Sequence, residues 1–125
     1  MTELADIFEE EQFCKELAER LNITYIKLPK DHGRYRVDTA ASIFDEIRMC
    51  DYTSVDIYLV CFYHELGHIL VTRDNVSFLS KFERELHAWK YGLRELEKSY
   101  NVTYEMVNFM LDALLTYVWA TETYK

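Results

Sequence analysis

The chain has 125 residues, of which 50% are apolar, and a formal net charge of −8. This length predicts a single domain over residues 1–125 that can bury a core without disulfide bonds, and the composition excludes a disordered chain. The acidic balance argues against direct binding to nucleic acid, because such a surface repels phosphate; basic peptides or proteins are the more natural partners.

Cysteine usage and the chain ends bear on the compartment. The chain contains three widely spaced cysteines: Cys14, Cys50 and Cys61. They form no disulfide framework and no Cys-x-x-Cys pattern, so we expect buried thiols in a reducing compartment. Residues 1–11 are acidic and show no secretory signal, and Glu105 and Asp112 interrupt the most apolar segment before it could span a membrane. We therefore expect a cytoplasmic protein without membrane contact.

The first half of the chain predicts one helix and a small sheet. From Glu3 to Leu21, apolar residues recur at spacings of three and four, which indicates an amphipathic helix. Residues 23–28 are rich in β-formers and end at Pro29, which indicates a strand. Residues 34–38 alternate apolar and charged side chains, so we expect a second strand. This strand could pair with the first as a hairpin.

The stretch from Ala40 to Met49 has two interpretations. Asp38 or Thr39 could cap a short helix here, or the stretch could form a third strand.

The second half predicts three helices. Residues 54–71 are long and apolar after a cap-rich stretch, which indicates a buried helix packed in the centre of the fold. Residues 78–100 follow as an amphipathic helix. Asn101 or Thr103 could cap a last helix reaching Ala120, which is apolar nearly all round and therefore either central or an oligomer contact. We expect an α+β fold, mostly helical, with a small antiparallel sheet of two or three strands.

The predicted central helix carries the sequence His64-Glu65-Leu66-Gly67-His68, an H-E-x-x-H motif. Histidines four apart lie on one helix face, so both imidazoles can reach one metal ion, and Zn²⁺ suits such ligands. Glu65 beside them could act as the general base toward a water molecule. Gly67 costs a helix interior about 1 kcal/mol against Ala, which a closely approaching backbone or substrate would explain.

A catalytic zinc site needs a third protein ligand, and the next predicted helix offers two acids, Glu83 and Glu85. They are two residues apart, about 200° around a helix, so at most one can face the metal. Glu85 lies on the less charged face beside small residues such as Ala88, and we favour it over Glu83. The remaining histidines are His32, in a predicted turn, and His87.

The HELGHIL stretch, followed by Glu85-x-x-Ala88 on a later helix, resembles the ImmA/IrrE family of metallo-endopeptidases, found in bacteria, phages and mobile elements. The resemblance implies a zincin-like fold, with His64, His68 and Glu85 binding Zn²⁺ and Glu65 as the base. It also implies a protein substrate, for which a helix-turn-helix transcriptional repressor is one possibility.

Two positions depart from the family pattern. His87 stands where the family often has Glu, and Trp89 stands where it often has Asp or Asn. An Asp or Asn there can accept a hydrogen bond from a ligand histidine, which Trp cannot do. Asp45, Glu46 or a backbone carbonyl could replace it.

A peptidase also needs a hydrogen-bond donor for the oxyanion of its transition state. The candidates are His87, Tyr91, Arg34, Tyr35 and Arg36. If Glu85 faces the metal, His87 points away, so a strand or loop donor is favoured. The family fold further implies that an edge strand near the cleft could hold an extended substrate.

Three interpretations therefore compete. The first is a zinc-dependent endopeptidase that hydrolyses a peptide bond in a protein partner. The second is a non-catalytic zinc-binding module, such as an anti-repressor or inhibitor, that acts by protein contact. The third is a structural protein whose motif is incidental and which would bind no metal.

Overall fold

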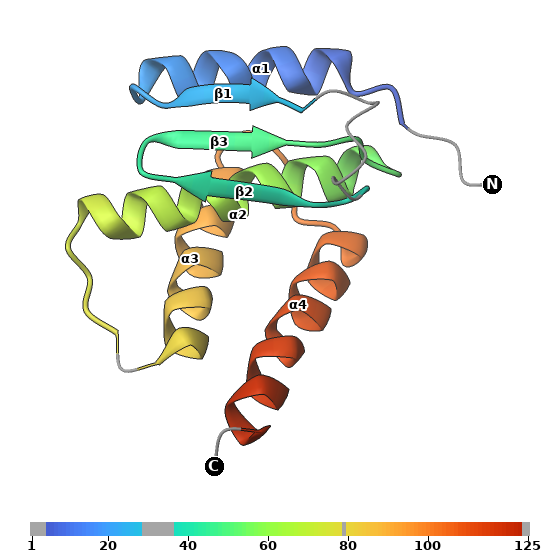
Figure 1. Ribbon diagram of the computed structural model, residues 1–125. Helices are drawn as coiled ribbons and strands as arrows, with labels where there is room; N and C mark the ends of the chain where they lie inside the picture. Colours follow the sequence, from blue (N-terminus) through green and yellow to red (C-terminus); the bar gives the residue numbers. More distant parts are fainter. Residues whose placement is uncertain (1–4, 29–36, 79, 124–125) are drawn as a thin grey trace.

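The computed structural model describes residues 5–28, 37–78 and 80–123 of the chain. In chain order its elements are α1 (Phe8–Arg20), β1 (Thr24–Lys27), β2 (Ala40–Ile43), β3 (Glu46–Met49), α2 (Val55–Arg73), α3 (Lys81–Leu96) and α4 (Tyr104–Thr123) (Figure 1). The expectation of an α+β, mostly helical chain with a small sheet is confirmed. No helix in the described part is long and apolar enough to cross a membrane.

The sheet is mixed, so the prediction of an antiparallel sheet is wrong. Its strand order is β1-β3-β2, with β1 parallel and β2 antiparallel to β3. Ile47 and Met49 of β3 are fully buried, so the strand with the most deeply buried side chains lies in the middle. Pairing is decided by burial of such side chains across the fold, and proximity in sequence does not determine it.

The predicted hairpin between residues 23–28 and 34–38 is therefore wrong for its first strand, since β1 pairs with β3. Residues 34–36 lie outside the described residues, and Val37 and Asp38 form a turn in which Asp38 has a positive φ of 63°. The Asp38 carboxylate accepts hydrogen bonds from the backbone N–H and hydroxyl of Thr53, both at 2.8 Å. Asp38 thus ties this turn to the start of α2 and caps no helix.

Residues 40–49 form neither the short helix nor one single strand. They fold into β2 and β3, joined by a tight turn at Phe44 and Asp45 in which Phe44 has a φ of 53°. The sequence predicts one continuous element where two short strands meet, because no Gly or Asn marks the left-handed position of the turn.

Helix α1 begins at Phe8, five residues later than predicted from Glu3. Before it, the backbone N–H of Ala5 donates to the carbonyl of Tyr52, which ties this segment to the stretch that precedes α2. All three cysteines are buried free thiols, as predicted.

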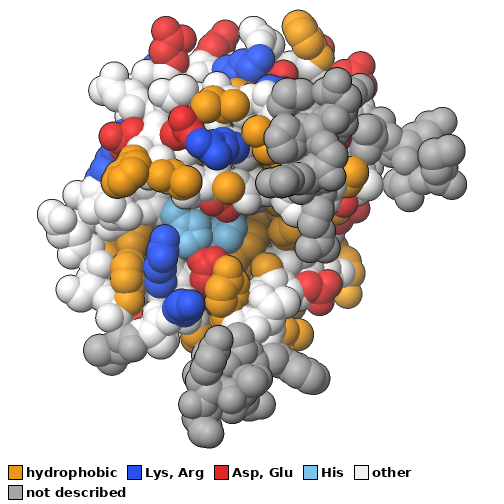
Figure 2. All heavy atoms as spheres, in the orientation of Figure 1, with side chains coloured by type: hydrophobic (Ala, Val, Ile, Leu, Met, Phe, Trp, Pro, Cys, Tyr) orange, Lys and Arg blue, Asp and Glu red, His pale blue; other side chains and the backbone are white. Residues whose placement is uncertain are grey.

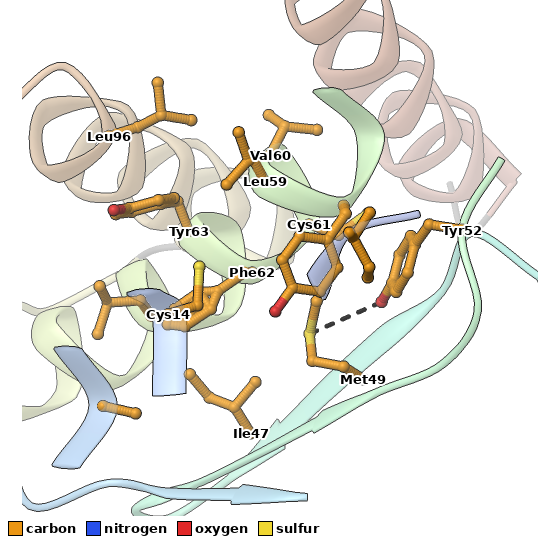
Figure 3. Close-up of a cluster of buried hydrophobic side chains, with 14 of the residues drawn as sticks. Cys14, Ile47, Met49, Tyr52, Leu59, Val60, Cys61, Phe62, Tyr63 and Leu96 are labelled. Atoms are coloured by element: carbon orange, nitrogen blue, oxygen red, sulfur yellow. Dashed lines mark hydrogen bonds between the residues drawn. The ribbon is translucent and has the colours of Figure 1, made fainter. Parts of the chain in front are cut away.

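Helix α2 contacts α1, α3, α4, β2 and β3. Its N-cap is Ser54, whose hydroxyl accepts the backbone N–H of Ile57 as the sequence suggested. The hydrophobic core gathers along its buried side, where Phe62 meets Cys14 of α1, Ile47 of β3 and neighbouring residues (Figure 3). Burying each large apolar side chain contributes about 1.5–3 kcal/mol, so this core holds α2 in place.

The last two helices are shorter or less buried than predicted. Ser80 caps α3, which begins after Phe78 and ends before Tyr100. Of the two residues proposed to cap α4, Thr103 is the cap. Its hydroxyl accepts a hydrogen bond from the backbone N–H of Met106 and donates one to the carboxylate of Asp56. Exposed apolar side chains on α4, Tyr104, Leu111 and Leu115, show that this helix is not central.

Candidate metal and catalytic site

The two histidines of the motif lie one turn apart on α2, with ring centroids 4.7 Å apart. The ligand atoms of His64, Glu65 and His68 all lie within 4.8 Å of one another. Glu85 reaches the same point from α3: its Oε2 lies 2.6 Å from His68 Nε2 and 3.7 Å from His64 Nε2. The structure therefore brings together all four residues that the sequence singled out.

Two glycines allow α2 and α3 to approach this closely. A Cβ atom on Gly67 would lie 1.9 Å from the carbonyl oxygen of Ala88, and one on Gly92 would lie 2.3 Å from that of Tyr63. Both contacts are with backbone, which cannot move aside cheaply. A glycine inside helix α2 is thus explained as the sequence suggested, by another backbone that passes close to it. The same close approach of α3 brings Glu85 to the histidines.

Glu85 is 7% exposed, whereas Glu83 is half-buried and makes no ion pair with His64 or His68 among the described residues. Glu83 lies 3.8 Å from His87, its partner one turn along α3. Burial alone would raise the pKa of Glu85, but the adjacent His64 and His68 imidazoles outweigh it and hold that pKa below its usual range. Glu85 is thus an anionic carboxylate against two imidazoles.

Trp89 takes the place beside His64 that a hydrogen-bonding residue was expected to fill. Its indole stacks on the imidazole with centroids 3.9 Å apart and an interplanar angle of 3°. The carboxylates considered as substitutes are engaged elsewhere, Asp45 with Arg73 and Glu46 with Arg48. The plane of the His64 ring is therefore held by stacking.

Glu65 is 8% exposed and is held by a residue that sequence reasoning missed. The hydroxyl of Ser42, on β2, donates to Glu65 Oε1 at 2.7 Å, while Oε2 lies 3.5 Å from His64 Nδ1. Ser42 reaches Glu65 only because β2 packs against α2. A serine in a short strand gives no sign in the sequence that it will contact Glu65.

These residues line a hollow that Figure 2 shows with the histidine side chains at its base. The hollow has a volume of ≈ 470 Å³ and runs between residues 38–42, along edge strand β2, and helix α4. From α4, Phe109, Ala113 and Tyr117 form the opposite wall. A segment of extended peptide would fit between an edge strand and such a wall.

Tyr117 is the second residue that sequence reasoning missed. Its hydroxyl interacts with Glu85, and burial together with this hydrogen bond raises its pKa to about 12. Tyr117 is therefore a neutral hydrogen-bond donor in the cleft at ordinary pH.

The donors proposed from the sequence are placed elsewhere or lie outside the described residues. His87 contacts Glu83 and the ring of Phe78. Tyr91 interacts with Asp74. Arg34, Tyr35 and Arg36 fall in the segment that the structure does not describe.

The donor set fits a zinc ion. Among the described side chains, His64 Nε2 is buried and makes no hydrogen bond, which a polar atom tolerates when it serves a metal. Two imidazoles and a carboxylate form a common catalytic zinc set. Ligand atoms around tetrahedral zinc are about 3.3 Å apart. His68 Nε2 and Glu85 Oε2 lie 2.6 Å apart, so they would have to separate by about 0.7 Å to bind it.

Comparison of the chain with protein-family models, curated proteins and solved structures finds no match.

Proposed function

We propose that this protein is a zinc-dependent endopeptidase that hydrolyses a peptide bond in a protein partner. His64, His68 and Glu85 would hold the zinc ion, and Glu65 would act as the general base. The observation that carries the proposal is the meeting of two helix histidines, a buried anionic carboxylate from α3 and a buried, positioned Glu65 in one cleft. The zincin-like fold implied by the family resemblance is part of this proposal.

Zinc, when bound, would supply Lewis acidity that polarises the substrate carbonyl and lowers the pKa of a nearby water. Glu65 would take the proton of that water and pass it to the leaving amine. Ser42 supports this role, because its hydrogen bond occupies Oε1 and leaves Oε2 on the side of His64. The low exposure of Glu65 keeps bulk water from competing for it.

Tyr117 would turn its single hydroxyl proton from Glu85 to the oxyanion that forms when water attacks the carbonyl. It lines the cleft with His68 and Glu65, and its raised pKa keeps its proton in place. Edge strand β2 supports a peptide substrate: its inner side pairs with β3, and residues 39–42 line the cleft. Among the described strands, none pairs with the outer edge of β2, and an extended peptide could add there through main-chain hydrogen bonds.

Zinc content per chain, measured by elemental analysis, tests the metal site. We expect about one zinc per wild-type chain and none in His64→Ala prepared in the same way. Glu65→Gln should then keep its zinc and lose cleavage of a peptide mixture. A wild type that takes up no zinc when supplied with it would overturn the proposal.

The partner that the net charge of −8 favours is a basic protein, and a transcriptional repressor of the helix-turn-helix class is one proposal of this kind. The second candidate function, a non-catalytic contact module, is favoured by the exposed Leu111 and Leu115 on α4, which could also form an oligomer contact. Glu65→Gln separates the two functions, because it should abolish cleavage and leave a contact function intact.

A further inference from the structure

One end of the cleft carries two cationic side chains. Lys81 and Arg84, both from the first turn of α3, line a hollow of ≈ 290 Å³ whose inner part holds the carboxylates of Glu65 and Glu85 beside Ser42, His68 and Tyr117. Arg84 also borders the adjoining hollow formed with His68 and the β2–β3 turn. Figure 2 shows Lys and Arg side chains directly beside the histidines.

These two cations are available to a ligand. Both are exposed, and neither forms an ion pair or a side-chain hydrogen bond with another residue in the described part of the chain. Some other basic side chains of the fold are engaged: Lys27 pairs with Glu11, Arg48 with Glu46 and Arg73 with Asp45. Arg20, Lys90 and Arg94 also form no ion pair among the described residues, but they line none of the hollows beside the histidines, so Lys81 and Arg84 are set apart by their place at the cleft.

The opposite end of the cleft has a different character. It is lined by Asp38, Thr39 and small or aromatic residues, with no Lys or Arg among the described residues there. The two ends of the cleft therefore differ in charge. A bound peptide would meet Lys and Arg side chains on one side of the zinc ligands only.

We infer that Lys81 and Arg84 form a subsite for an acidic side chain of the substrate, on one side of the scissile bond. This inference rests on the proposed peptidase function and names its sequence preference. Arg84 offers a planar fork for a carboxylate and Lys81 a second charge beside it. The whole chain would attract a basic partner, while the cleft would select within it a segment that carries Asp or Glu.

The test is a synthetic library of capped, randomised peptides digested by the zinc-loaded protein, with cleavage positions read by mass spectrometry. We expect Asp and Glu to be enriched about tenfold at one position on one side of the bond, a size set by two partly exposed charge contacts. The enrichment should shrink in 1 M salt, where screening acts over about 3 Å.

The variant Lys81→Glu/Arg84→Glu should lose this enrichment and favour Lys or Arg at the same position. The matched control is Lys90→Glu/Arg94→Glu, on exposed positions of the same helix outside the cleft, which changes net charge equally and should keep the wild-type preference. Cleavage without any acidic preference, or an equal change in both variants, would overturn the subsite and leave the peptidase function standing.

A wild type that cleaves nothing would instead refute the peptidase function, and the subsite is then judged by binding. The same library is passed over immobilised Glu65→Gln protein. Retention of acidic peptides that the Lys81→Glu/Arg84→Glu change abolishes would support the subsite. Retention indifferent to peptide charge, or no retention, would overturn it.

Discussion

The indole of Trp89 lies parallel to the imidazole of His64, with ring centroids 3.9 Å apart. An aromatic stack fixes the ring plane but leaves its rotation within that plane free, unlike the hydrogen bond that commonly orients a ligand histidine. Trp89→Leu should therefore weaken zinc binding about tenfold, while Trp89→Phe, which keeps an aromatic face, should lose less. Chelator competition measures both affinities.

Phe109→Leu serves as the control. The ring of Phe109 meets that of Trp89 edge-on, with centroids 6.5 Å apart, and this substitution should leave the stack of Trp89 on His64 in place. Circular dichroism confirms that each variant is folded. Wild-type zinc affinity in a folded Trp89→Leu variant would show that the stack does not position the ligand.

Gly67→Ala should destabilise the fold by at least about 3 kcal/mol, because the added Cβ would overlap the backbone carbonyl of Ala88 and force α2 and α3 apart. Urea unfolding measures the loss. Thr72→Ala, at an exposed position of the same helix, should change stability by no more than about 0.5 kcal/mol. Equal stability of Gly67→Ala and wild type would contradict the close helix approach.

Ser42→Ala should lower kcat/KM about tenfold without changing zinc affinity, since Glu65 would lose the hydrogen bond that holds its Oε1. Ser42→Thr keeps a hydroxyl at the same place and should retain most of the activity. Steady-state kinetics on a cleaved peptide decide this. Loss of zinc in Ser42→Ala would mean that the residue supports the metal site more broadly.

Tyr117→Phe removes one hydroxyl and should lower kcat about a hundredfold, with KM little changed, if this hydroxyl serves the oxyanion of the transition state. Tyr104→Phe, at the exposed start of the same helix, should keep wild-type kinetics. A fall in zinc content equal to the fall in kcat would assign Tyr117 to supporting Glu85 instead.

Zinc should raise the thermal stability of the wild type, by about 2.7 kcal/mol when its free concentration is one hundred times Kd. Glu85→Gln should lose most of this gain, because it removes the anionic ligand, whereas Glu83→Gln should keep it. Melting curves with and without zinc measure both. The opposite pattern would make Glu83 the third ligand.

Local features of this protein could be predicted from its sequence because they depend on neighbours along the chain. Helical spacing alone puts His64 and His68 on one face, and Ser54 caps α2 through a bond three residues away. The same periodicity placed Glu85, and not Glu83, on the face of α3 that meets α2. The mistake at residues 40–49 arose where the local signal failed, at a turn that Phe44 makes without Gly or Asn.

Tertiary structure decided what depends on distant segments. The parallel pairing of β1 with β3, the hydrogen bond from Ser42 to Glu65 and the approach of Tyr117 to Glu85 each join residues 22 or more positions apart. Such contacts form because burying the core around α2 sets where the sheet and α4 can lie, and this burial is a property of the whole chain. The sequence by itself therefore determined the residues of the candidate metal site, and only the packed fold determined which side chains hold, shape and charge the cleft around it.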